Sequence, residues 1–321
     1  MGSQIVADRG ATICSHGVVI SVREWFVALP LLATLACGDG GGPIGSEPAF
    51  PRGTTILDLT YCRPGGRDLN LDLYLPTTPE RAPAILFLHG GGWITGDKRE
   101  SGWFDAVRER LLDQGFIVAS ANYRLAPGNA WPAHIEDAKC AVRFLRAERE
   151  TYGIDPDHIG VWGTSAGAHL AALVGVTNAG AGFEGTGGQA AESSRVQAVV
   201  DLYGPADLTD GEGWPDGHLA VLRLVFGTSN LDDPVLAEAS PVFHATSDDP
   251  PFLILHGERD GLVPIRQSER LFAALAASGA AVEFVPVENA RHGLEPLGGE
   301  IRPSKEEITG RIVEFFDAEL R

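Results

Sequence analysis

The chain has 321 residues, of which 44% are hydrophobic and 21% are charged, which is enough apolar material for a globular core. It carries 43 acidic and 25 basic side chains, giving a formal net charge of −18. Such a negative field repels nucleic acids and anionic membranes, so the composition argues against both as partners.

The N-terminal residues 1–50 are expected to lie outside the catalytic fold. Arg23 is followed by a short apolar run that ends at Ala36, directly before Cys37 and a Gly-rich stretch. This run is too short to span a bilayer as a helix and is typical of a signal-peptide core. It is similar to a bacterial lipoprotein signal followed by a flexible linker, although Thr34 stands where such signals usually carry Leu. We therefore predict export, with a cytoplasmic protein that has a disordered tail as the alternative.

The four cysteines show no CxxC spacing, which argues against a zinc or thioredoxin-type site. Cys62 and Cys140 could form a disulfide in an exported protein, but the sequence does not show that their Cα atoms come close enough. A buried free thiol at Cys140, on a predicted helix, is the alternative.

The first predicted strands of the 51–321 domain are antiparallel. Residues 69–75 alternate Leu with polar residues, which predicts a half-buried strand, and residues 54–61 are its expected partner across the Pro-Gly-Gly turn at 64–66. The later strands are near-continuous apolar runs, as in a parallel sheet that is buried on both faces. These runs are 84–89, 116–121, 158–163, 198–204 and 252–257.

Helical patterns separate the apolar runs, at 100–113, 132–152, 166–176, 265–278 and 304–319. Strands and helices in alternation predict a doubly wound, mostly parallel sheet. Two long irregular stretches remain, 178–195 and 206–250, and loops of this length are usually functional or disordered. Ligands of such sheets bind beyond the carboxyl ends of the strands, so we expect 206–250 to form a small cap over the site.

The pentapeptide Gly163-Thr164-Ser165-Ala166-Gly167 matches G-x-S-x-G between a predicted strand and a predicted helix. A sharp turn of this kind strains the serine backbone, and glycines two positions to either side avoid clashes. The Ser165 hydroxyl would then stand clear at a helix N-terminus, where developing negative charge is favoured. Ser165 is the candidate nucleophile.

A glycine-rich loop, His89-Gly90-Gly91-Gly92-Trp93, follows the apolar run at 84–89. Attack on an ester carbonyl creates an oxyanion that needs preorganised N–H donors, and glycines allow the backbone to supply them. The HGGG motif is the lipase and esterase version of such a loop. The amides of Gly91, Gly92 and Ala166 are the candidate donors. We expect His89 to brace the loop, and Trp93 either to line the substrate pocket or to pack in the core.

A serine needs a base, and His292 lies after the apolar strand 281–287 and before the last helix. Asp260 follows the 252–257 run and would orient the imidazole; the order Ser165, Asp260, His292 is that of the α/β-hydrolases. Glu258, on the same loop, and Asp207, after the preceding strand, are rival acids.

The remaining chemistry-bearing residues are expected to be structural. Four further histidines show no metal-ligand spacing, namely His134, His218, His244 and His256. The pairs Asp97-Lys98 and Tyr123-Arg124 are expected to brace loops near the strand ends.

The chain resembles the bacterial feruloyl-esterase-like carboxylesterases, which are close to the hormone-sensitive-lipase-type esterases of the α/β-hydrolase superfamily. The resemblance covers about residues 53–320 and rests on five motifs: HGGGW, YRLAP (123–127), DPDHIGVWGTSAGAHLAAL (155–173), PPFLILHGERDGLVP (250–264) and ARHG (290–293). The chain departs from many relatives in having Ala168, not Gly, before His169. The resemblance implies a small insertion, an open cleft and a bulky or polymer-linked ester as substrate.

The sequence therefore predicts a serine carboxylesterase that hydrolyses short-chain or aromatic, feruloyl-type esters through an acyl-enzyme, with no cofactor and no metal. An amide-bond hydrolase, such as an arylformamidase or a peptidase-like enzyme, is the first alternative. A non-catalytic binding protein on the same fold is the second.

Overall fold

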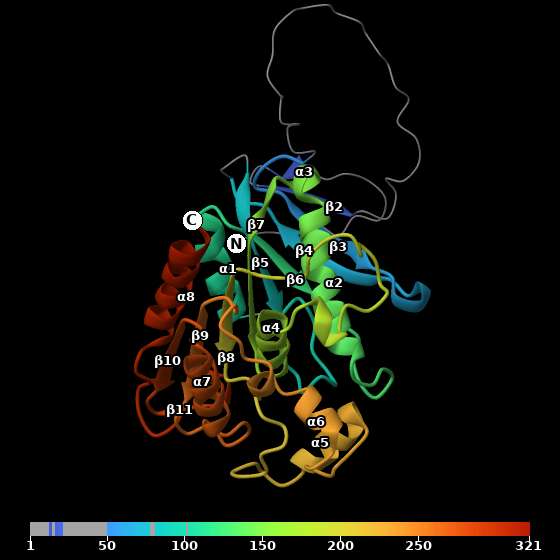
Figure 1. The fold of residues 1–321 in the computed structure, drawn as a ribbon. Helices are drawn as coiled ribbons and strands as arrows, with labels where there is room; N and C mark the ends of the chain where they lie inside the picture. The colour runs from blue at the N-terminus through green and yellow to red at the C-terminus, as the bar shows by residue number, and fades with distance from the viewer. Residues whose placement is uncertain (1–12, 15–16, 22–49, 78–80, 101) are drawn as a thin grey trace, which may run out of the picture.

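The computed structural model describes residues 13–14, 17–21, 50–77, 81–100 and 102–321, and a twisted sheet runs through its centre (Figure 1). The strands of this sheet are β1 (Ile13–Cys14), β2 (Gly17–Ser21), β3 (Thr55–Cys62), β4 (Leu69–Tyr74), β5 (Ala82–Leu88), β6 (Ile117–Ala121), β7 (Ile154–Thr164), β8 (Ala198–Leu202), β9 (Phe252–Gly257) and β10 (Val282–Val287). The helices are α1 (Trp103–Asp113), α2 (Ala133–Ala147), α3 (Arg149–Tyr152), α4 (Ala166–Val176), α5 (His218–Phe226), α6 (Pro234–Glu238), α7 (Arg266–Ser278) and α8 (Lys305–Leu320).

The strand order is β1-β2-β3-β4-β6-β5-β7-β8-β9-β10. Neighbours from β6 to β10 are parallel, whereas β4 is antiparallel to both β3 and β6. This is the predicted doubly wound, mostly parallel sheet with antiparallel N-terminal strands. β1 and β2 come from the segment expected to lie outside the fold, and β2 pairs with β3. The predicted signal core ending at Ala36 lies outside the described residues.

Helices cover both faces of the sheet, which explains the near-continuous apolar runs. α1 and α8 pack on one face, and α2, α4 and α7 pack on the other (Figure 1). Every residue of β5, β6, β8 and β9 is buried. The parallel strands therefore point their carboxyl ends to one edge, where the loops with functional motifs begin.

Two local expectations from the sequence were wrong. Asp72 alternates with leucines in β4 but is fully buried, because its carboxylate accepts hydrogen bonds from Arg99 Nε at 2.7 Å and from the Asp58 amide at 2.8 Å. The helix predicted over 132–152 is two helices, α2 and α3, because the backbone leaves the helical region at Glu148.

The irregular stretch 178–195 is fixed by side chains of α2. The ammonium of Lys139, which is fully buried, donates to the Thr177 carbonyl at 2.9 Å, to Glu184 at 3.1 Å and to the Ser194 hydroxyl at 3.1 Å. Burial lowers the pKa of Lys139. These contacts hold the stretch against α2, and it contributes no residue to the cavity around the candidate nucleophile.

A disulfide joins Cys62, at the end of β3, to Cys140 of α2, with their Cα atoms 6.3 Å apart. The pairing that the sequence left open is therefore the one formed. Gly187 lies directly on this bond, where a Cβ would overlap the Cys62 sulfur, and its carbonyl accepts from the Arg63 amide at 2.8 Å. The disulfide thus links the antiparallel edge of the sheet, α2 and the irregular stretch.

The 206–250 segment contains α5, α6 and a short 3-10 helix, Pro241–Phe243. Its helices lie together beyond the carboxyl ends of the parallel strands (Figure 1). The Trp131 amide donates to the Val225 carbonyl at 3.0 Å, which ties α5 to the loop before α2. The segment is thus placed where a wall for a site at the strand ends would stand.

Candidate active site

Ser165 stands on a strained turn between β7 and α4. Its backbone has φ 52° and ψ −118°, a region that costs free energy for a residue with a Cβ. The flanking glycines make this turn possible. A Cβ on Gly163 would overlap the Gly167 backbone, and a Cβ on Gly167 would overlap the Leu88 carbonyl oxygen of β5.

The glycine-rich loop after β5 lies against the same turn. A Cβ on Gly90 would come within 3.5 Å of the Ser165 Cβ. Gly91 and Gly92 have φ of 109° and 60°, which favour glycine. Among the described residues, no hydrogen bond uses the amide of Gly91, Gly92 or Ala166 as donor. The three free N–H groups therefore belong to the two loops that pack against one another at the serine.

His292 and Asp260 complete a hydrogen-bonded chain to Ser165. The His292 Nε2 atom lies 3.1 Å from the Ser165 hydroxyl, and its Nδ1 atom lies 2.7 Å from Asp260 Oδ2. Since a carboxylate only accepts, Nδ1 carries the proton and Nε2 is free to accept from the serine. This arrangement is the one that general-base activation of a serine requires.

Asp260 is held as an anion. Its Oδ1 atom accepts from the amides of Leu262 at 2.8 Å and Val263 at 3.0 Å. Burial raises the pKa of the Asp260 carboxyl, but hydrogen bonds from His256 and His292 outweigh burial and hold the pKa well below its usual range. The carboxylate is therefore ionised wherever the protein is folded near neutral pH.

The two rival acids are placed elsewhere. Asp207 is fully buried and accepts from Arg270 Nε at 2.7 Å and from the Thr209 hydroxyl at 2.6 Å, so its oxygens are engaged away from His292. Glu258 is exposed at the surface of the loop. The hydrogen bonds of His292 run to Ser165 and Asp260.

An apolar cavity of about 260 Å³ opens beside the serine. Ser165, Ala166 and Gly92 line it, so residues of both loops border one space. Its wall is mostly supplied by the 206–250 segment and the loop after β9. These apolar wall residues are Leu208, Trp214, Pro215, Val221, Leu222, Leu262 and Val263.

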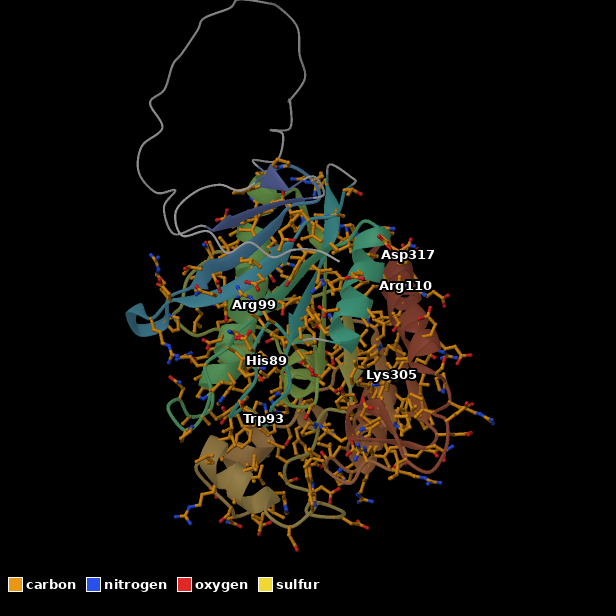
Figure 2. All side chains as sticks on the ribbon, turned by 180° about the vertical axis from the view of Figure 1, so that it is seen from behind. His89, Trp93, Arg99, Arg110, Lys305 and Asp317 are labelled. Atoms are coloured by element: carbon orange, nitrogen blue, oxygen red, sulfur yellow. A yellow bond between two sulfur atoms is a disulfide. The ribbon has the colours of Figure 1, made fainter. Side chains whose placement is uncertain are left out.

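Trp93 both lines the cavity and packs in the core, the two alternatives that the sequence left open. Its indole is buried and has edge contact with Phe226 of α5, with 5.4 Å between ring centroids. Trp93 thus lies beside the 206–250 segment (Figure 2). The indole N–H donates to His169 Nδ1 at 3.3 Å, and His169 Nε2–H donates to the Ala239 carbonyl at 2.7 Å. Burial lowers the pKa of His169 to about 3, so it stays a neutral relay that fixes the indole.

Sequence reasoning missed Tyr203, which supports the base. Its backbone has φ 50°, and its buried ring has edge contact with the His292 ring at 4.9 Å between centroids. Its place directly after the apolar run of β8 was a positional signal, but the contact with residue 292 is visible only in three dimensions.

The pairs expected to brace loops do so. The Tyr123 hydroxyl donates to the His89 carbonyl at 2.8 Å, and its ring stacks on that imidazole. Lys98 Nζ donates to Asp58 at 2.8 Å, and the Arg124 guanidinium holds Asp137. In the described ranges, no group of three or more His, Cys, Asp and Glu side chains could hold a metal ion.

The BD-FAE family model matches residues 71–275 of the chain. The chain is 37% identical over 244 residues to esterase LipQ of Mycobacterium tuberculosis (strain ATCC 25618 / H37Rv), covering 74% of this chain and 57% of LipQ. It is 36% identical over 230 residues to esterase LipC of the same organism, covering 70% of this chain and 56% of LipC. The chain thus spans little more than half the length of these curated relatives.

Solved structures show the same fold. The esterase Est2 of the planctomycete Thermogutta terrifontis, with propionate bound, matches with a TM-score of 0.67 at 27% identity, covering 82% of this chain and 93% of Est2. A truncated carbohydrate esterase from gut microbiota matches with a TM-score of 0.69 at 29% identity, covering 85% of this chain and 99% of that one. The architecture is that of an α/β-hydrolase, and the chain belongs to the BD-FAE family.

Proposed function

We propose that this chain is a serine carboxylesterase in which Ser165 is the nucleophile, His292 the general base and Asp260 the acid that orients it. The observation that carries the proposal is the unbroken hydrogen-bonded chain from the Asp260 carboxylate through the His292 imidazole to the Ser165 hydroxyl. Its relatives LipQ and LipC are named esterases, which supports the reaction class.

The proposed reaction has two halves. His292 Nε2 takes the hydroxyl proton as Ser165 Oγ bonds to the ester carbonyl carbon, and the same imidazole then protonates the leaving alcohol as its bond to that carbon breaks. Water enters, gives its proton to His292 and attacks the acyl-enzyme; the proton returns to Ser165 as the acid leaves. His292 Nε2 therefore accepts and returns every proton that is transferred in the two halves.

The free amides would stabilise the charge that develops on the carbonyl oxygen. Gly91, Gly92 and Ala166 have N–H groups without intramolecular acceptors in the described part of the chain. The Ala166 amide also begins α4, whose N-terminus favours negative charge. Removing one such donor costs about 3 kcal/mol of transition-state stabilisation in comparable sites.

The cavity bears on the substrate class. At about 260 Å³ it is smaller than the roughly 300–1,000 Å³ of sites for drug-sized ligands. We propose that it takes the apolar side group of a short-chain or compact aromatic ester, and that residues 206–250 act as the cap that limits the length of that group. The sugar or polymer of a polymer-linked ester would then lie outside the cavity.

A substrate panel with one knockout tests the reaction. Purified protein is assayed on p-nitrophenyl acetate, butyrate and octanoate, methyl ferulate, an N-formyl arylamine and a p-nitroanilide. We expect ester cleavage to exceed amide cleavage, with activity falling between butyrate and octanoate. Ser165→Ala should lower kcat at least about 10³-fold. Dominant amide cleavage, or an active Ser165→Ala variant, would overturn the proposal.

We further propose export. The Cys62–Cys140 disulfide is the support, because such bonds persist in oxidising compartments and are rare in the cytosol. Within the described ranges, no helix is long and apolar enough to cross a membrane. Cell fractionation, with thiol alkylation before lysis, tests the proposal: we expect the oxidised form in the exported fraction, and a reduced cytosolic protein would contradict it.

A further inference from the structure

A second imidazole touches the acid of the candidate triad. His256 lies near the end of β9, its side chain is fully buried, and the reaction described above does not use it. Its Nε2 atom lies 3.3 Å from Asp260 Oδ2, the same oxygen that receives the His292 Nδ1 proton at 2.7 Å. One carboxylate oxygen therefore stands between two imidazoles.

The partners of His256 place a proton on its Nε2 atom. Nε2 lies 2.9 Å from the Val263 carbonyl oxygen, which can only accept, so Nε2 carries a proton. Nδ1 lies 2.7 Å from the Ser268 hydroxyl of α7 and hydrogen-bonds with it. The Nε2–H of His256 thus hydrogen-bonds the Val263 carbonyl, and Asp260 Oδ2 is a second, longer contact of the same nitrogen.

The surroundings of His256 contain few other titratable groups. Asp201 of β8 interacts with it electrostatically, and the Tyr203 ring has edge contact with it at 6.5 Å between centroids. From α7, the neutral side chain of Ser268 is buried and contacts His256. Asp260 is therefore the charged acceptor nearest to the His256 Nε2–H, which also hydrogen-bonds the Val263 carbonyl.

We propose that His256 is a positioning residue for the triad: its Nε2–H holds Asp260 Oδ2 in line with His292 Nδ1. This inference rests on the proposed function. The two amides on Oδ1 fix one end of the carboxylate, and His256 fixes the other end. Without His256, Oδ2 would depend on His292 alone, and the carboxylate could turn as the imidazole moves during proton transfer.

Three substitutions separate this role from simple packing. His256→Leu removes the donor. His256→Gln can place an amide N–H close to the former Nε2 position, whereas the shorter amide of His256→Asn falls near Nδ1 and does not reach Asp260. Gln and Asn thus form a matched polar pair that differs in reach. The measurements are kcat, KM, the pH profile of kcat/KM on p-nitrophenyl butyrate, and Tm.

We expect His256→Leu and His256→Asn to lower kcat about 10- to 100-fold, the range for losing a hydrogen bond to a charged group. KM should stay within about twofold, because His256 does not line the cavity. The acid limb of the profile should move to higher pH, since removing an N–H dipole aimed at Asp260 stabilises the His292 imidazolium. His256→Gln should recover kcat and the acid limb.

A merely structural residue would lower Tm and leave the acid limb unmoved, with Gln and Asn equivalent. That result would overturn the inference. If the Leu variant does not fold, the Gln and Asn pair decides by the same criteria. Ser165→Ala, assayed in parallel, distinguishes failure of this inference from failure of the proposed function. An active Ser165→Ala variant would contradict the proposed function itself. An inactive Ser165→Ala variant, together with His256 variants that behave like the wild type, would contradict only the role of His256.

Discussion

The buried carboxyl of Asp201 on β8 should make the free energy of unfolding depend on pH, and replacing Asp201 with Asn should remove that dependence. Asp201 is fully buried; its Oδ1 atom accepts from the Gly204 amide at 2.8 Å, and its Oδ2 atom has no partner among the described residues. Burial raises the pKa of Asp201 from 3.8 to about 6, against the lowering effects of the Gly204 hydrogen bond and of His256. We consider the substitution Asp201→Asn.

The sign follows from linkage. Because the folded-state pKa is raised, the folded protein keeps the Asp201 proton longer than the unfolded chain does. The stability that this provides is fully present below pH about 4 and is lost as the pH rises through about 6. A shift from 3.8 to about 6 corresponds to about 3 kcal/mol. Asparagine does not titrate, so the Asp201→Asn variant does not lose this stability as the pH rises.

The assay is urea unfolding of both proteins at several values between pH 4 and pH 8. We expect the free energy of unfolding of the variant to gain about 2.4 kcal/mol on that of the wild type across this range, because part of the effect already lies below pH 4. All other groups titrate in both proteins, so the difference isolates residue 201. Asp232→Asn, at an exposed position, controls for the chemical change. A difference that is constant with pH would refute the reasoning.

Three further predictions concern other parts of the chain. Replacing both Cys62 and Cys140 with Ser should lower the free energy of urea unfolding by up to about 4.5 kcal/mol, because the bond closes a loop of 78 residues. Val221→Phe should narrow the cavity and lower kcat/KM for butyrate at least about tenfold relative to acetate; an unchanged ratio would contradict the cavity assignment. Gly167→Ala should abolish soluble, active protein, whereas Gly310→Ala, which meets open space, should not.

The sheet could be predicted from sequence because burial on both faces leaves a compositional trace. β8 and β9 are continuous apolar runs, and the structure buries every residue in them. The prediction failed where a polar residue is buried by distant partners. Asp72 alternates like a surface residue, and only the fold brings Arg99 and the Asp58 amide to its carboxylate.

The motif residues of the site could be predicted because each needs a particular local backbone. Ser165 requires a strained turn with glycines, and Gly91 requires a positive φ, so both leave a sequence signature. The residues that support the site, His169 and Tyr203, could not be predicted, since their contacts join separate elements. Nothing in the local sequence of His169 indicates a bond to the Trp93 indole, and nothing around Tyr203 indicates contact with the base.

The catalytic geometry and the range of accepted substrates are set by different parts of the chain. The nucleophile and the glycine-rich loop follow β7 and β5, which are neighbours in the sheet, and Gly90 and Gly167 let the two loops pack on one another. The cavity wall comes instead mainly from the 206–250 segment, between β8 and β9. Changes in that wall can therefore alter which ester enters without moving the hydroxyl, the imidazole or the amides. This explains why the motifs predict the reaction class, whereas the size of the accepted side group follows only from how α5 sits over the strand ends.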